Sequence, residues 1–98
     1  MGLAARVGDS VATGHACDAT TTLAATNHNV NIQGSNATVV GDLTEAHGFI
    51  PPACAPHTAS INAGSSKVTI GGIPAARVGD SCDAGTITSG ASQVNIGG

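Results

Sequence analysis

The residues best suited to chemistry in this chain are histidines and cysteines that follow three copies of a Gly-Asp dipeptide. In chain order they are His15 and Cys17, then His47, Cys54 and His57, and last Cys82. Imidazole nitrogen and thiolate sulfur are ligands that zinc takes readily in proteins. If the three loops converge, the pattern predicts a metal site between them.

A tetrahedral site needs four ligands. The expected set is His15, His47, His57 and Cys82. Cys17 and Cys54 stay open as replacements for one of these ligands, because small cysteines also pack as hydrophobic side chains. His28 is expected inside the first strand, at the register of Ser66 and Ser92, so we expect a structural or exposed role for it.

An internal repeat positions these loops. Residues 4–9 and 75–80 share the sequence Ala-Ala-Arg-Val-Gly-Asp, and residues 37–42 keep its Gly-Asp but lose the arginine. Gly supplies unusual dihedral angles and Asp bonds its own backbone, so each copy predicts a turn. We expect Arg6 and Arg77 to pair with Asp9 and Asp80, or to bond carbonyl groups of the neighbouring hairpin.

The segments around the repeats alternate apolar and polar residues, which indicates half-buried strands. They are residues 30–32, 68–72 and 94–98. Glycine-containing turns follow them, so the fold class is all-β and built from hairpins. Half a hairpin remains at each end of the chain. Pairing of the two ends would close a ring of three hairpins and remove free sheet edges.

Two further segments have weaker signals. Residues 20–25 are expected to form a short strand or a turn. Residues 45–60 contain Pro51, Pro52 and Pro56, which favour a structured loop and exclude a helix.

Length and composition predict a single domain over residues 1–98 with a poor core. The hydrophobic fraction of 41% is largely Ala, Val and Ile, and Phe49 is the one aromatic residue. Small domains of this kind usually need a staple such as a metal, disulfides or a partner chain. Three cysteines cannot all pair within the chain, so we expect reduced thiols and metal ligation rather than disulfides.

Several classes of protein are not expected. With only Arg6, Lys67 and Arg77 as basic residues the chain has no patch for nucleic acid. No apolar run approaches the roughly 18 residues of a membrane helix. Residues 1–6 have neither a basic start nor an apolar run, so no signal peptide is expected and synthesis is expected in the cytoplasm.

The sequence resembles the PAAR-repeat proteins. The resemblance is strong over residues 64–82, which contain Pro-Ala-Ala-Arg at 74–77 followed by Val-Gly-Asp, clear at 3–9 and 90–98, and weak at 26–42. It implies a small cone of three β-hairpin repeats with pseudo-threefold symmetry. It also implies one structural metal ion near the apex, typically zinc, held by three His and one Cys. Carried onto this chain, these ligands are His15, His47, His57 and Cys82. His and Cys also bind iron, so the resemblance alone does not separate the two metals.

The function implied by the resemblance is mechanical. Such proteins form the sharp tip on the blunt end of a trimeric β-helical spike in contractile injection machines, which are type VI secretion systems or phage tails. The tip would help to pierce the target envelope. The expected partners are one spike trimer per tip, a separate effector as cargo, and transiently the target membrane. The tip would leave the cell on the spike or be carried in a virion tail.

The alternative is a free-standing zinc-binding module or a small metalloenzyme. A Cys–His pair can form a nucleophile, and three ligands with a water can form a catalytic zinc site. Candidate acids are few, namely Glu45, Asp18 and Asp83. Four protein ligands leave no open position, which favours a structural metal. We therefore expect a protein with no catalytic residues that is not an enzyme.

Overall fold

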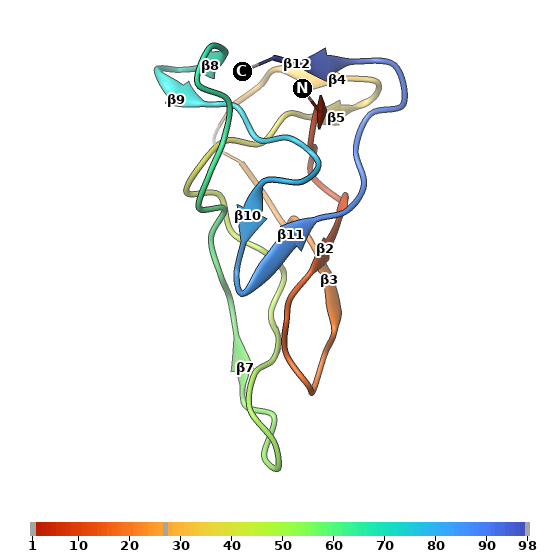
Figure 1. The fold of residues 1–98 in the computed structure, drawn as a ribbon, viewed down its shortest axis with the longest axis vertical. Coiled ribbons are helices and arrows are strands. Elements are labelled where there is room, and N and C mark those ends of the chain that lie inside the picture. Colours follow the sequence, from red (N-terminus) through yellow and green to blue (C-terminus); the bar gives the residue numbers. More distant parts are fainter. Residues whose placement is uncertain (1, 27, 98) are drawn as a thin grey trace.

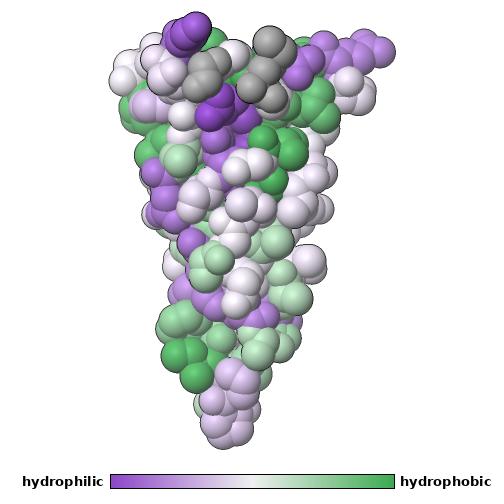
Figure 2. Space-filling model, in the orientation of Figure 1, coloured by the Kyte–Doolittle hydropathy of each residue, from purple (hydrophilic) through white to green (hydrophobic). Residues whose placement is uncertain are grey.

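The chain forms an elongated body built from short β-strands. The computed structural model describes residues 2–26 and 28–97, measures 40 × 22 × 22 Å and narrows towards one end (Figures 1 and 2). No helix occurs among these described residues, which confirms the all-β prediction. The strands are β1 (Gly2–Leu3), β2 (Ser10–Ala12), β3 (Thr20–Thr22), β4 (Asn31–Ile32), β5 (Ser35–Asn36), β6 (His47–Gly48), β7 (Pro56–His57), β8 (Thr69–Ile70), β9 (Ile73–Pro74), β10 (Ser81–Cys82), β11 (Gly85–Ile87) and β12 (Asn95–Ile96).

Two tight hairpins and one pair of terminal strands lie at the broad end (Figure 1). Strand β4 pairs with β5, and β8 pairs with β9. The turn residues Gln33 and Gly34 have positive φ, as do Gly71 and Gly72, which is the backbone of a tight two-residue hairpin loop. Strand β1 pairs antiparallel with β12, so the predicted pairing of the chain ends is confirmed.

A closed ring of three backbone hydrogen bonds joins the three repeat copies beside β1. The amide of Ala5 donates to the carbonyl of Ala76 (3.0 Å). The amide of Ala76 donates to Thr38 (2.9 Å), and the amide of Thr38 donates to Ala5 (3.0 Å). All three side chains are fully buried. Residues this small let three backbones meet at one point, which explains the alanines of the repeat.

Each repeat copy then makes the same turn. Gly8, Gly41 and Gly79 have φ between 92° and 95°, where a side chain is strained. Their amides donate to the carbonyls of Leu23, Ile61 and Ile87, respectively, at 2.8–2.9 Å. These three residues are buried and form the core with Val11. A large buried aliphatic side chain contributes about 1.5–3 kcal/mol, so the turns help to position three side chains that stabilise the core.

The arginine and aspartate of the repeat form the predicted pairs. The guanidinium of Arg6 donates to Asp9, and that of Arg77 donates to Asp80 at 2.8 Å. The guanidinium of Arg6 also reaches the carbonyl of Gln33 in the turn between β4 and β5, and that of Arg77 reaches the carbonyls of Gly64 and Gly97. Both proposed roles of arginine are therefore present together.

Below the turns, the chain forms an antiparallel sheet in the order β10-β11-β2-β3. Residues 20–22 of the predicted strand or turn are β3 within this sheet. The proline-containing segment differs from the expected loop, because β6 and β7 form a hairpin within it. Pro56 pairs at the end of a two-stranded ribbon with no further neighbour, a position that tolerates the missing amide hydrogen.

Candidate metal centre

Four side chains from separate loops converge near the narrow end. His15 follows β2, His47 lies in β6 and His57 lies opposite it in β7. Asp83 occupies the turn between β10 and β11, with φ of 56°. One potential ligand atom from each of the four lies within 4.8 Å of all the others. Strand β7 marks this region in Figure 1.

The donor atoms have the spacing of a coordination site. The Nε2 atom of His57 lies 3.2 Å from Nε2 of His15 and 3.0 Å from Nε2 of His47. Zinc–nitrogen bonds of about 2.0–2.1 Å in a tetrahedron separate the nitrogens by about 3.3 Å. The Asp83 carboxylate adds oxygens at 2.7 Å from Nε2 of both His15 and His47. These residues fit a small divalent cation.

The available protons do not satisfy this cluster. Nδ1 of His47 lies 2.9 Å from the carbonyl oxygen of Glu45, so Nδ1 donates its proton to that oxygen. Nε2 of the same ring faces the Nε2 atom of His57 and a carboxylate oxygen of Asp83. A neutral ring has one N–H, which serves one acceptor. A cation between the four residues would bind all the lone pairs together.

Burial strengthens the electrostatic interactions of the cluster. The side chains of His47 and Asp83 are 3% and 7% exposed, whereas that of His57 is 27% exposed. Burial alone would raise the pKa of Asp83, but its hydrogen bonds to His47, His15 and His57 outweigh that effect and lower the pKa. Asp83 is therefore a carboxylate anion at neutral pH.

Phe49 packs against the histidines, a role that the sequence analysis did not predict. Its ring stacks on His57 with centroids 4.3 Å apart, and it meets the edge of His15 at 4.8 Å. These contacts restrict the ring orientations of two ligands and shield them from water. Aromatic contacts of this kind contribute about 0.5–1.5 kcal/mol each.

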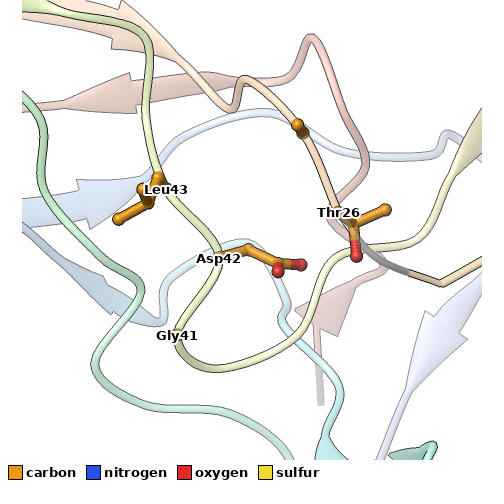
Figure 3. A pocket seen from close by; sticks show the side chains of 5 residues that line it. Thr26, Gly41, Asp42 and Leu43 are labelled. Atoms are coloured by element: carbon orange, nitrogen blue, oxygen red, sulfur yellow. The ribbon is translucent and has the colours of Figure 1, made fainter.

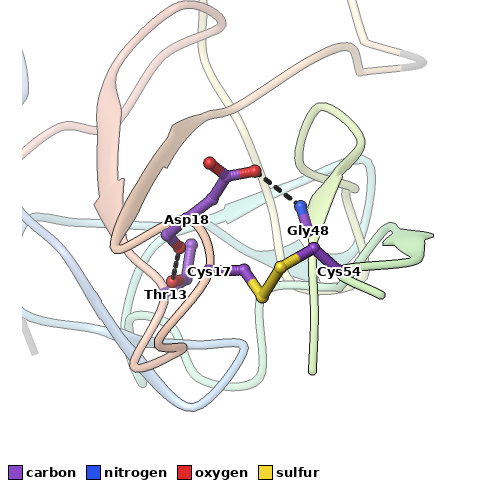
Figure 4. The surroundings of a disulfide bond; sticks show 5 residues. All are labelled: Thr13, Cys17, Asp18, Gly48 and Cys54. Atoms are coloured by element: carbon purple, nitrogen blue, oxygen red, sulfur yellow. Dashed lines mark hydrogen bonds between the residues drawn. A yellow bond between two sulfur atoms is a disulfide. The ribbon is translucent and has the colours of Figure 1, made fainter. Parts of the chain in front are cut away.

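A disulfide links two of the loops that carry the candidate ligands. Cys17 and Cys54 are bonded, with Cα atoms 5.8 Å apart (Figure 4). The expectation of three reduced cysteines is therefore wrong, because an odd count forbids complete pairing but permits one bond. Gly48 lies between the two cysteines, since an added Cβ would meet each of their Cβ atoms at 3.1 Å. Its amide donates to the Asp18 carboxylate (2.6 Å).

The loop before this disulfide is ordered by Thr13. Its hydroxyl donates to the carbonyl of Asp18, and it accepts a hydrogen bond from the amide of His15 (3.1 Å). Thr13 is completely buried. This local bonding sets the direction in which His15 leaves β2.

Cys82 is not part of the cluster formed by the three histidines and Asp83. It is fully buried in the core with Leu23, Ile61 and Ile87. Burial, with the neighbouring Asp83 carboxylate, raises the pKa of its thiol to about 11. Cys82 ends β10 with its side chain in the core, and Asp83 begins the following turn with positive φ, where its carboxylate contacts the histidines. The expected three histidines are brought together, and the fourth position holds Asp83.

The sequence held one signal for Asp83. It directly follows a candidate ligand and stands in a short turn, but it reads equally as a turn residue there. His28 stays apart from the cluster, and its imidazole packs against Gly71 at the broad end.

The buried Cys82 thiol will not react with a thiol reagent in the native protein at pH 8. With a pKa of about 11, about one thiol in a thousand is ionised at that pH. A colorimetric thiol assay should detect no cysteine in the folded protein and one after unfolding. All three should appear after unfolding with a reductant. Rapid reaction of the folded protein would contradict the burial of Cys82.

Within the described residues, no helix is long and apolar enough to cross a membrane. No curated protein shows a significant sequence match to this chain. Residues 53–98 match the sequence profile described as the PAAR motif. Members of that family are structural spike tips rather than enzymes, and they bind the VgrG spike trimer and are delivered at the tip of the secretion spike. Residues 53–98 of this chain are therefore similar to the PAAR motif family.

Proposed function

We propose that this chain is the metal-stabilised tip of a trimeric β-helical spike in a contractile injection machine, either a type VI secretion system or a phage tail. The observation that carries the proposal is the ring of hydrogen bonds between Ala5, Thr38 and Ala76. Three copies of one backbone arrangement within a single chain support pseudo-threefold symmetry. A chain with that symmetry can cap a trimer, because each spike subunit then meets an equivalent surface.

The broad end offers the surface for such docking. It carries the pairs β4–β5, β8–β9 and β1–β12, whose outer strand edges can accept further strands. Apolar side chains are visible on this end in Figure 2, and Val30, Val68 and Ile73 are among the exposed large hydrophobic residues. Main-chain pairing would supply orientation, and these side chains would supply apolar contact area.

The narrow end is suited to mechanical load and contact with the target envelope. The disulfide and the cluster of His15, His47, His57 and Asp83 lie behind the terminal loop. Ile50, within that loop, is 58% exposed. Rigid cross-links behind an exposed apolar loop support transient contact with a membrane during piercing.

We propose zinc as the ion, with one ion per chain held by His15, His47, His57 and Asp83. Zinc accepts three imidazoles and a carboxylate, and four protein ligands leave no position for substrate. Cys82 stays the alternative fourth ligand, and iron the alternative metal. A structural ion would support the tip without catalysis. Effector proteins would be carried as cargo by the spike, as separate chains.

The test is association with a purified trimeric β-helical spike protein, measured by native mass spectrometry. We expect one chain per trimer. Ile73→Asp, in β9 at the broad end, should weaken the complex at least tenfold, since a buried unpaired charge costs more than the roughly 1.4 kcal/mol that this factor requires. Ile50→Asp, at the narrow end, is the matched control and should bind as the wild type does. Equal weakening by both variants, or no complex, would refute the docking proposal.

A further inference from the structure

The three repeat turns differ in one chemical respect. At two of them the aspartate binds an arginine of its own chain, with Arg6 contacting both carboxylate oxygens of Asp9 and Arg77 both oxygens of Asp80. At the third turn, Val39 stands at the arginine position. Asp42 therefore has no arginine from its own repeat.

The Asp42 carboxylate is nevertheless held as the other two are. The amide of Val39 donates to its Oδ2 atom at 2.9 Å. The corresponding distances are 2.7 Å at Asp9 and 2.8 Å at Asp80. The side chain keeps the orientation that binds a guanidinium at the other turns.

A second donor is missing as well. The hydroxyl of Ser89 donates to Oδ1 of Asp9 at 3.3 Å. The amide of Thr88 pairs with the carbonyl of Ser10 as the amide of Ala24 pairs with that of Leu43, so Ala25 corresponds to Ser89. Alanine has no hydroxyl, and Oδ1 of Asp42 has lost both kinds of partner found at Asp9.

A pocket of about 220 Å³ lies beside Ala25 and Asp42. It is lined by Ala25, Thr26, Gly41, Asp42 and Leu43. Figure 3 shows the carboxylate of Asp42 and the hydroxyl of Thr26 facing the same space. The Thr26 hydroxyl oxygen is buried and has no hydrogen-bond partner within the described part of the chain. A carboxylate and an unpartnered hydroxyl beside a cavity indicate a cationic hydrogen-bond donor as ligand.

We propose that the pocket beside Asp42 binds the guanidinium group of an arginine side chain supplied by another protein chain. The two equivalent turns show how the group is bound, with paired bonds to the carboxylate and further bonds to carbonyl oxygens. Arg77, for example, also donates to the carbonyl of Gly64. A planar guanidinium makes these bonds together, whereas the ammonium group of lysine acts as a point charge. This site does not depend on the spike-tip function.

The test is an NMR titration of the ¹⁵N-labelled protein with a capped Gly-Arg-Gly peptide. We expect saturable shifts of the amides of Thr26, Gly41 and Leu43. The amides of Gly8 and Gly79 should not move, because their turns already hold an arginine. A capped Gly-Lys-Gly peptide at equal ionic strength is the control for charge alone and should bind at least fivefold more weakly.

Two variants make the result decisive. Asp42→Asn keeps an oxygen for the Val39 amide and should abolish the saturable shifts. Val39→Arg should place an arginine of the same chain in the pocket, exclude the peptide and raise the midpoint of thermal unfolding. Linear shifts, shifts that persist in Asp42→Asn, or equal binding of the lysine peptide would overturn the proposal. Peptide binding that survives in a folded Val39→Arg variant would also overturn it.

Discussion

The variant His47→Ala will contain no metal and will lose about 4 kcal/mol or more of unfolding free energy. An ion present at about a thousand times its dissociation constant contributes about 4 kcal/mol to the folded state. His47 is the most buried of the three histidines, and its Nε2 atom faces both His57 and Asp83. The measurement is elemental mass spectrometry of purified protein, combined with urea unfolding of the same sample.

The control for this substitution is His28→Ala. His28 lies outside the metal cluster, so this variant should keep one ion per chain. Treating the wild type with a strong chelator should reproduce the stability loss of His47→Ala, apart from the cost of the cavity. A folded wild type that contains no metal would contradict the metal centre, and so would unchanged metal content in His47→Ala.

The same assay identifies the fourth ligand. Asp83→Asn should lose the ion or bind it much more weakly, because the amide replaces a charged oxygen ligand. Cys82→Ser should keep the ion, since Cys82 lies in the apolar core. The reverse pattern would assign the fourth position to Cys82.

Removal of the disulfide, in the double variant Cys17→Ser and Cys54→Ser, will cost about 4 kcal/mol of stability. The bond closes a loop with a sequence separation of 37 residues, and the chain-entropy relation gives this value for a loop of that length. The measurement is urea unfolding of oxidised wild type and of the double variant, each with its metal content determined.

The disulfide also links the loop of His15 to the hairpin of His47 and His57. The double variant should therefore bind its metal more weakly, because the ligands are less preorganised. Cys82→Ala is the matched control, since it removes a cysteine and leaves the disulfide intact. Equal stability of the double variant and the wild type would contradict a cross-link in the folded protein, as would three reactive thiols in unfolded protein without reductant.

Local patterns were sufficient for the hairpins and the turns. Gln33-Gly34 and Gly71-Gly72 adopt positive φ and close the hairpins at the places that the alternating segments indicate. The Gly-Asp turns depend on contacts within four residues, such as the amide of Arg6 with the Asp9 carboxylate. Such interactions join residues that are close together in the sequence, so they do not depend on the rest of the fold.

The ligand set was only partly accessible from the sequence. Repeat position selected His15, His47 and His57, because equivalent loops end at the same level of the body. It could not separate Cys82 from Asp83. Cys82 is the last residue of β10 and Asp83 is the first residue of the following turn, so the two neighbouring side chains have different surroundings. The choice depended on how β10 packs against the core.

The sequence by itself determined an all-β chain of repeated hairpins, paired chain ends, arginine–aspartate pairs at two turns and three histidines in one place. Only the tertiary structure decided that Asp83 joins the histidines, that Cys17 meets Cys54, and that the turn at Asp42 leaves an open pocket. The first group follows from dihedral preferences and hydrogen bonds between near neighbours or equivalent repeats. The second depends on distances between loops far apart in the chain, which are set when the three repeat copies pack around a common core.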